Sequence, residues 1–284
     1  MASNKAALPS RPPRRIDWCT LGGLALALGG IIGGLVLEGG RIQDVAQITA
    51  AAIVLGGTLG AVLISKPFDQ VYGACRRVVD VVVAEHGSGV EMATDHLIVL
   101  ARQVRRLGIA SLEEEAQKAD DPFLRKALGI AADGVDSREL RRIMELEIEI
   151  EQRRFEADSA VFEAGGGYSP TIGIIGAVLG LIQVMKHLEH LEEVGRGIAV
   201  AFVATVYGVA LANILLLPIA AKIQARAKIV EEQRELILTG VLAIAAGTNP
   251  RLIQLQLDAY RHGARPEPAS SLDAINPGKL AQVG

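Results

Sequence analysis

The chain has 284 residues, half of them hydrophobic, with a mean hydropathy of +0.32 and a formal net charge of −3. That charge favours neither a strongly acidic nor a strongly basic partner, and we expect no binding of nucleic acid. Only 4% of the residues are aromatic whereas 31 are glycine, a composition that argues against one large soluble core and is typical of helices packed closely in a membrane.

Charged residues are missing from four windows of the sequence: residues 18–37, 45–65, 164–185 and 197–221. Each reaches the roughly 20 apolar residues that a helix needs to cross a bilayer. We interpret the first window as a retained helix because no convincing cleavage site follows it. A fifth uncharged stretch, residues 236–250, is too short and too polar at its end, and is predicted to be a cytoplasmic helix.

The distribution of Lys and Arg predicts the orientation. If the N-terminus is cytoplasmic, all but three of the 29 basic residues lie on the inner side, as the positive-inside rule requires. The predicted fold is an all-α polytopic membrane protein with four spans, both termini inside and a large helical region between spans two and three. The predicted segments are a disordered basic N-terminus (1–16), spans one and two (17–65), the cytoplasmic helical region (66–163), spans three and four (164–222), C-terminal helices (223–263) and a disordered tail (264–284).

Glycines recur every four residues in the windows, as at positions 29 and 33, 30 and 34, 56 and 60, and 176 and 180. Such pairs make a flat face for another helix. Packing within one chain accounts for most of them, so they only suggest that copies of the chain associate.

No window contains Asp, Glu, Lys, Arg or His. Ion carriers usually hold an ionisable group near the middle of the membrane. Either the chain moves no ions, or it forms one wall of a path whose acid comes from a partner. The polar residues available within the windows are Thr20, Gln47, Thr49, Thr58, Ser169, Thr171, Gln183, Thr205, Tyr207 and Asn213.

Two prolines stand near the predicted cytoplasmic surface, Pro170 opening span three and Pro218 closing span four. Each frees a backbone carbonyl or loosens a turn, which suits a hinge; alternatively, Pro170 merely begins a helix. Ala177 and Thr205 are predicted to lie at a similar depth, because spans three and four are antiparallel. The Thr205 hydroxyl either bonds to its own helix or faces a water-filled path.

His187 and His190 in the predicted outer loop have an i, i+3 spacing that can bind a metal. Two histidines on a wet surface are a weak signal, and we predict no metal site and no cofactor. The sequence shows no phosphate loop, nucleophile triad or zinc pattern, so we expect no enzymatic activity.

Several motifs resemble one known family. The run PTIGIIGAVLGLI at 170–182 is similar to the third span of the flagellar stator A subunits (the MotA/PomA family, related to ExbB/TolQ). The run GIAVAFVATVYGV at 197–209, with Ala212-Asn213 and LPIA at 217–220, resembles its fourth span, and Val241 to Arg251 resembles its tail motif. The resemblance covers about residues 16–262.

The resemblance implies a torque-generating, ion-conducting homopentamer in the bacterial inner membrane. Five A subunits surround a dimer of B subunits (MotB/PomB-like), whose aspartate binds the ion. Pro170 and Pro218 then match the prolines that couple ion binding to cytoplasmic movement, and Thr205 matches the threonine that faces the aspartate. Ala177 falls where sodium-driven members tend to carry threonine, so H⁺ is favoured over Na⁺ as the transported ion.

The segment RRLGIASLE at 105–113 resembles the region whose Arg and Glu touch the rotor switch protein FliG. By that match the rotor interface is Arg105 and Glu113; Arg106 and Glu114 or Glu115 could share the role, and a plain solvated helix is the other interpretation. Two other functions stay open: an ExbB/TolQ-like energiser of outer-membrane processes, and a non-conducting membrane scaffold. The four-span layout argues against the ExbB-like order of helices.

Overall fold

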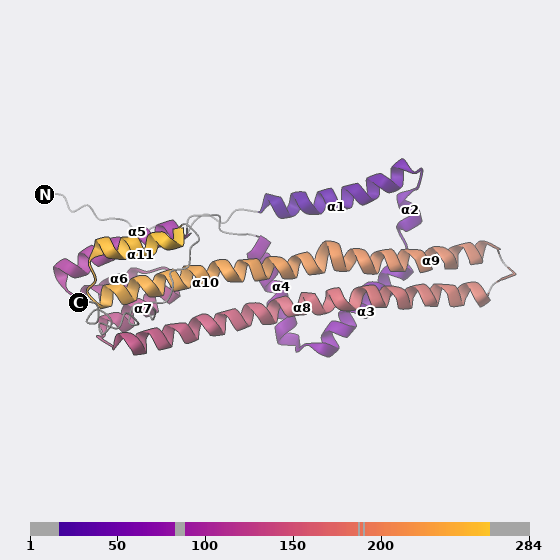
Figure 1. Ribbon diagram of the computed structural model, residues 1–284. Helices are drawn as coiled ribbons and strands as arrows, with labels where there is room; N and C mark the ends of the chain where they lie inside the picture. The colour runs from indigo at the N-terminus through magenta and orange to yellow at the C-terminus, as the bar shows by residue number, and fades with distance from the viewer. Residues whose placement is uncertain (1–16, 83–88, 187, 190, 262–284) are drawn as a thin grey trace, which may run out of the picture. The chain divides into compact units, whose positions relative to one another are not determined.

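The computed structural model describes residues 17–82, 89–186, 188–189 and 191–261, and all regular structure in these residues is helical (Figure 1). The predicted disordered ends, 1–16 and 264–284, lie outside the described residues. The helices are α1 Trp18–Leu37, α2 Ile42–Val45, α3 Ile48–Ser65, α4 Phe68–Val82, α5 Gly89–Leu107, α6 Ser111–Lys118, α7 Pro122–Ala132, α8 Ser137–Lys186, α9 Leu191–Ala210, the π-helix η1 Leu211–Leu216, α10 Leu217–Ala245 and α11 Pro250–Arg261.

The contacts divide the chain into two compact units. Of the described residues, the span unit comprises 17–82, 149–186, 188–189 and 191–229, and the loop unit comprises 89–148 and 230–261. The long helices α8 and α10 each continue from one unit into the other. The boundaries that charge suggested, between residues 163 and 164 and between 222 and 223, therefore fall inside continuous helices, because a charged side chain marks the end of an apolar surface and not the end of a hydrogen-bonded helix.

Four helical segments of the described residues are long and apolar enough to cross a membrane. Helix α1 matches the first window from end to end. The first residues of the second window are not part of the spanning helix, because the helical structure is interrupted between α2 and α3 near Ala46. The third and fourth lie within much longer helices, α8 and the run from Glu192 to Ala245. The four predicted spans are thus confirmed as helices.

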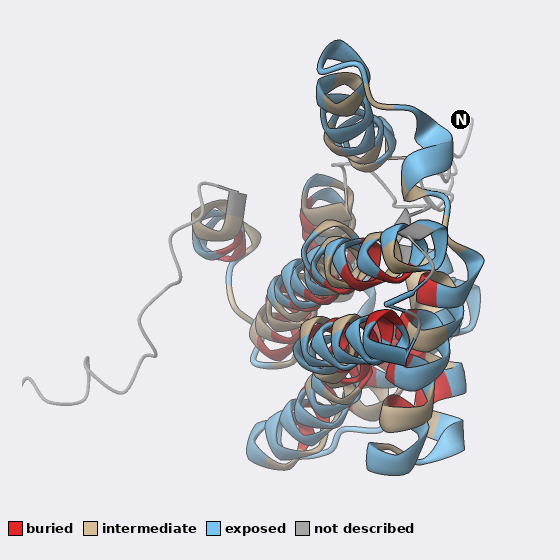
Figure 2. Cartoon of the chain, turned by 90° about the vertical axis from the view of Figure 1, so that its right-hand side faces the viewer, coloured by how far each residue is buried: buried red, intermediate tan, exposed pale blue. Residues whose placement is uncertain are grey.

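The span unit packs α3, α8 and α9 together, and α8 runs antiparallel beside α9 (Figure 1). One buried cluster joins Ala50 and Val54 of α3 to Val203 and Ala204 of α9. Helix α1 has no buried residue. Figure 2 shows the buried residues on the faces that the helices turn toward one another, with exposed residues on the outer faces.

Packing within one chain explains fewer of the glycine pairs than the sequence suggested. A Cβ added to any glycine of α1, or to Gly56 or Gly60 of α3, meets nothing within 4 Å. Of the four recurring pairs, only Gly176 with Gly180 presses against another helix of the same chain. The remaining glycine faces are open in the single chain.

The loop unit has a core like that of a soluble domain. Its fully buried side chains come from α5, α6, α7, the start of α8, the end of α10 and α11, among them Leu97, Leu112, Phe123, Leu140, Leu236 and Leu257. Arg234 of α10 adds a polar anchor, because it pairs with Asp121 at 2.7 Å and lies 4.6 Å from the centroid of the Phe123 ring. The stretch 236–250, predicted to be one cytoplasmic helix, is divided: residues 236–245 are the last turns of α10, and Pro250 begins α11.

Candidate functional site

Pro170 lies in the middle of α8, with helix continuing on both sides of it. Because proline has no N–H, the carbonyl of Gly166 loses its usual donor four residues later, and the pyrrolidine ring weakens that turn. The alternative that Pro170 begins a helix is wrong. The position is instead one where an α-helix bends easily.

Pro218 directly follows a wider helical turn. In η1 the N–H of Leu217 donates to the carbonyl of Ala212, five residues earlier. The helix then continues as α10 to Ala245, so Pro218 does not end the fourth helix, as its place in the charge pattern suggested. A π-turn next to a proline leaves backbone carbonyls without regular partners, and such turns occur often at functional sites.

The two irregular turns lie opposite each other, because α8 and α9 touch through glycines. A Cβ on Gly173 would lie 2.8 Å from the carbonyl oxygen of Ala204, and one on Gly180 would lie 2.8 Å from that of Gly197. Further along, a Cβ on Gly166 would lie 2.6 Å from Cδ2 of Leu217. The weakened turn before Pro170 therefore packs against the segment that joins η1 to Pro218.

Gly176 of α8 contacts Ala204 of α9: a Cβ added to Gly176 would lie 2.8 Å from the Cβ of Ala204. Ala177 is the residue after Gly176, and Thr205 is the residue after Ala204. They thus lie at a similar depth, as the antiparallel arrangement predicts, and both are partly exposed. The Thr205 hydroxyl donates to the carbonyl of Ala201 at 3.2 Å, within its own helix. The hydroxyl oxygen can still accept a hydrogen bond from a donor on its exposed side.

One bond at this level escaped the sequence analysis. The hydroxyl of Ser169, which is fully buried, donates across the helix pair to the carbonyl of Gly208 at 2.8 Å. The amide of Asn213 donates to the next carbonyl, that of Val209, at 3.0 Å. Both residues were recognised as polar members of the spans, but nothing in their spacing indicates a bond between two helices.

Next to this region, polar contacts join α8 to α10 on the side where the two helices leave the apolar windows. The Gln224 amide donates to Glu163 and, at 3.4 Å, to the Ser159 hydroxyl. The amide of Gln152 donates to the carbonyl of Ala227 at 3.0 Å. These contacts stabilise α8 and α10 as a pair beyond the two prolines.

Two ion pairs attach further helices of the span unit to this pair. Arg77 of α4 pairs with the buried Asp158 of α8 at 2.9 Å, and its guanidinium lies 4.2 Å from the centroid of the Phe155 ring. Lys222 of α10 donates to the carboxylate of Asp17, which caps α1. This hydrogen bond, helped by one from Thr20, lowers the pKa of Asp17 to about 2, so the Asp17 carboxylate is ionised at neutral pH.

The predicted rotor residues flank a tight turn of the loop unit. Gly108, with φ of +86°, ends α5 just after Arg105, and α6 begins at Ser111, just before Glu113. Lys118 pairs with Glu114 at 2.6 Å and with Glu115 at 3.2 Å.

The side chains of Arg105, Arg106 and Glu113 are exposed and form no ion pair or hydrogen bond within the part of the chain that the structure describes. Of the three neighbouring glutamates, Glu113 is therefore the one whose charge is available to a partner.

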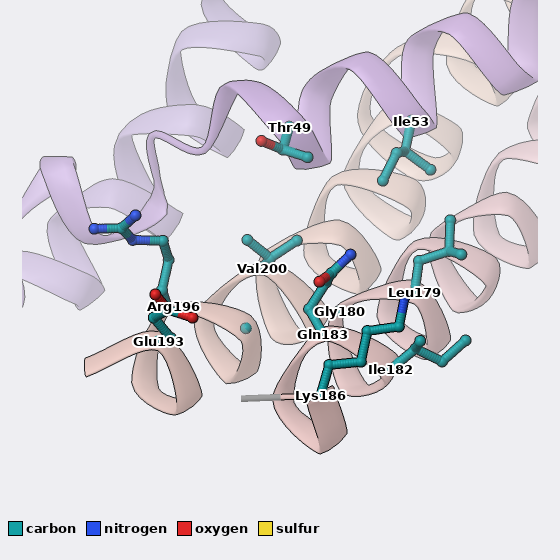
Figure 3. A pocket seen from close by; sticks show the side chains of 11 residues that line it. Thr49, Ile53, Leu179, Gly180, Ile182, Gln183, Lys186, Glu193, Arg196 and Val200 are labelled. Carbon is teal, nitrogen blue, oxygen red and sulfur yellow. The ribbon is translucent and has the colours of Figure 1, made fainter. Parts of the chain in front are cut away.

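A groove of about 580 Å³ opens at the ends of α3, α8 and α9 (Figure 3). Its lining residues are Thr49, Ile53, Leu179, Gly180, Ile182, Gln183, Lys186, Glu193, Arg196, Gly197 and Val200. On α8 the lining is apolar at Leu179 and Ile182 and becomes polar at Gln183 and Lys186. The charged lining residues, Lys186, Glu193 and Arg196, lie near the connection from α8 to α9. Neither Ala177 nor Thr205 lines it.

A metal site finds no support in the described residues, where no group of three or more His, Cys, Asp or Glu side chains is placed to hold an ion. His187 and His190 lie outside the described residues.

Three comparisons with known proteins agree on one family. The model of the MotA/TolQ/ExbB proton channel family matches residues 115–236. Motility protein A of Bacillus subtilis is 32% identical over 249 residues, which cover 86% of this chain and 91% of the relative. Chemotaxis protein PomA of Vibrio alginolyticus is 30% identical, covering 86% of this chain and 95% of the relative.

Two solved structures share the fold. The structure of C. jejuni MotAB superposes with a TM-score of 0.82 at 28% identity, covering 86% of this chain and 96% of the matched chain. The flagellar MotAB stator complex from Bacillus subtilis gives a TM-score of 0.79 at 31% identity, covering 94% of this chain and 100% of the matched chain. The expected resemblance is confirmed: this chain belongs to the MotA/TolQ/ExbB proton channel family and is similar along most of its length to the motility protein A subunits within it.

Proposed function

We propose that the chain is the A subunit of a proton-driven stator of the flagellar motor, in which copies of the chain form a pentamer around two B subunits. The observation that carries the proposal is the match to motility protein A over 91% of that protein's length. The lack of ionisable residues in the four windows supports a B-subunit partner, because a conducting path built from this chain needs an acid that the chain itself does not supply. The open glycine faces of α1 and α3 support packing against other copies.

In this proposal the ion passes between α8 and α9 of the chain and the aspartate of a B subunit. Thr205 faces that aspartate, and its oxygen accepts a hydrogen bond from the protonated acid. Ala177 lies at a similar depth and offers only a methyl group, which cannot coordinate Na⁺ as an oxygen ligand can. The proposed ion is therefore H⁺.

The proposed location is the bacterial inner membrane, with both termini in the cytoplasm, since this orientation keeps nearly all Lys and Arg inside. The loop unit then faces the rotor. Bending of α8 and α10 near Pro170 and Pro218 moves the loop unit, because both helices continue into it.

The energiser and scaffold functions are less well supported. An ExbB/TolQ-like subunit would have a different order of spans and loops, whereas here a helical region lies between the second and third of four membrane-length helices. A scaffold that conducts no ions would not need the two irregular turns, at Pro170 and at η1, that face each other in the helix pair.

The test is complementation of a strain from which this gene is deleted, with its partner gene intact. We expect the wild-type chain to restore swimming in soft agar, and a protonophore at constant Na⁺ to stop it. Removing Na⁺ at constant proton-motive force should leave the speed unchanged. Dependence of the speed on Na⁺ would contradict the proton assignment, and normal swimming without any copy of the gene would favour a different machine.

Glu113 provides a test of the rotor interface. Reversing its charge with Glu113→Lys should lower swimming speed by about tenfold at an unchanged amount of membrane-inserted protein, because close charge pairs between proteins contribute roughly 1.5 kcal/mol or more. The matched control is Glu114→Lys on the same turn of α6, whose native carboxylate is already paired with Lys118. Equal losses in the two variants would show that the whole acidic helix, and not Glu113, makes the contact.

A further inference from the structure

Ser169, the residue before Pro170, forms a hydrogen bond from its side chain on α8 to the backbone of α9 at the hinge. The side chain is fully buried, and its hydroxyl donates to the Gly208 carbonyl at 2.8 Å. The backbones also touch here, because a Cβ on Gly208 would lie 2.6 Å from the Ser169 carbonyl oxygen. No water competes for such a bond inside a packed membrane-spanning pair, so it persists unless the helices themselves move.

The acceptor of this bond belongs to the turn that precedes the wide helix. The carbonyls of Gly208 and Val209 both accept side-chain donors, one from Ser169 of α8 and one from Asn213 of η1. Helix α9 changes to η1 directly afterwards, at Leu211. The Ser169 bond therefore ties the weak turn at Pro170 to the start of the weak turn that ends at Pro218.

A second hydroxyl at this level is unpaired. Thr58 of α3 is 5% exposed, and its Oγ1 has no hydrogen-bond partner among the described residues. Its neighbour Gly57 would place a Cβ 2.8 Å from Ile172, and a Cβ on Gly165 would lie 3.4 Å from Val62. Thr58 thus lies beside α8 between the levels of residues 165 and 172. Buried hydroxyls are usually bonded, and the Thr58 hydroxyl beside the hinge is an exception among the described residues.

We propose that Ser169 is a positioning residue for torque generation: its bond to the Gly208 carbonyl latches α8 to α9 and sets the angle of the hinge at Pro170. The proposal rests on the stator function and deepens it. With the latch closed, the outer halves of α8 and α9 move as one body, and bending is confined to the turns beside the prolines. When it opens, α8 can bend without carrying α9 with it.

The test compares Ser169→Ala with Thr171→Val. Alanine removes the donor with little change in size. Thr171 is two residues away and exposed, and its hydroxyl donates at 2.7 Å to Tyr168 of its own helix, which makes it the matched control. Purified stator complexes of both variants and of wild type are compared by amide hydrogen exchange over residues 166–172 and 208–218. The torque that one stator adds is measured from the step height in bead-rotation speed as stators join a motor at high load.

For Ser169→Ala we expect exchange in these segments to rise about fivefold, the factor that corresponds to losing one hydrogen bond. The step height should fall while the amount in the membrane stays at the wild-type value. Thr171→Val should match wild type in both measurements. Unchanged exchange in Ser169→Ala overturns the latch, and faster exchange with an unchanged step height overturns its role in torque. If the wild-type chain itself drives no rotation, the stator function fails and so does the role in torque, whereas the exchange data still decide whether the latch exists.

Discussion

Replacing Pro170 with alanine is expected to abolish swimming while leaving the protein inserted in the membrane and at least as stable as wild type. Pro170 lies inside a helix of 50 residues, where proline costs about 3 kcal/mol relative to alanine. Alanine restores the N–H that the Gly166 carbonyl lacks and straightens the turn. Bending α8 at this turn then costs that bond, and roughly 3 kcal/mol corresponds to more than a hundredfold loss in the population or rate of the bent state. Soft-agar swimming and thermal melting of the purified complex measure the two effects.

Pro122 provides the control for this prediction. It is the first residue of α7, following the capping residue Asp121, and an N–H at that position has no partner within the helix. Pro122→Ala should therefore swim normally. A Pro170→Ala variant that swims normally at a wild-type level of insertion would remove the hinge from the mechanism. One that is missing from the membrane would instead indicate that Pro170 serves folding.

The four membrane-length helices could be predicted from the sequence because they depend on a one-dimensional property, the lack of charge over a sufficient length. Helix α1 follows its window to the residue. The ends of the other long helices could not be predicted in this way, because α8 continues through charged residues that pair along its surface, as Arg153 does with Glu149. Charge sets where a helix leaves the lipid, whereas backbone hydrogen bonds and packing in the loop unit set where it ends.

The functional region was predicted in part. Proline is recognisable in any sequence, and the similar depth of Ala177 and Thr205 follows from counting residues in two antiparallel helices. The wide turn η1 was not predicted, because no composition signal distinguishes LANILL from an ordinary α-helical turn. The bond from Ser169 to Gly208 also escaped prediction, since it depends on the rotation of each helix about its own axis.

The two ion pairs outside the windows, Arg77 with Asp158 and Lys222 with Asp17, also could not be predicted from the sequence. The Asp158 that binds Arg77 and the Lys222 that binds Asp17 appear in the sequence as ordinary charged residues at the edge of a span. Only the packing of α4 on α8, and the placement of the start of α1 beside α10, turns each of them into a specific pair.

Replacing Gly208 with alanine is expected to have an effect as large as that of Pro170→Ala, but through assembly of the helix pair. The added Cβ would lie 2.6 Å from the Ser169 carbonyl oxygen and 3.0 Å from Cα of Gly173. Both neighbours are backbone atoms, which cannot rotate away as a side chain can, so the two helices must separate or turn. Overpacking of this kind costs roughly 1–3 kcal/mol, and separation also breaks the Ser169 bond. We expect less than about a tenth of the wild-type swimming and a lower melting temperature of the purified complex.

Gly195→Ala is the matched control, because Gly195 lies on the same helix α9 and a Cβ there meets nothing within 4 Å. Alanine stabilises a helix by about 1 kcal/mol relative to glycine, so this variant should melt at or above the wild-type temperature and swim normally. The two variants add the same methyl group to the same helix and differ only in what that group meets. If Gly208→Ala also melts and swims like wild type, α8 and α9 do not approach as closely in the assembled stator as they do in the single chain, and the opposed turns at Pro170 and Pro218 would lose the contact through which they act together.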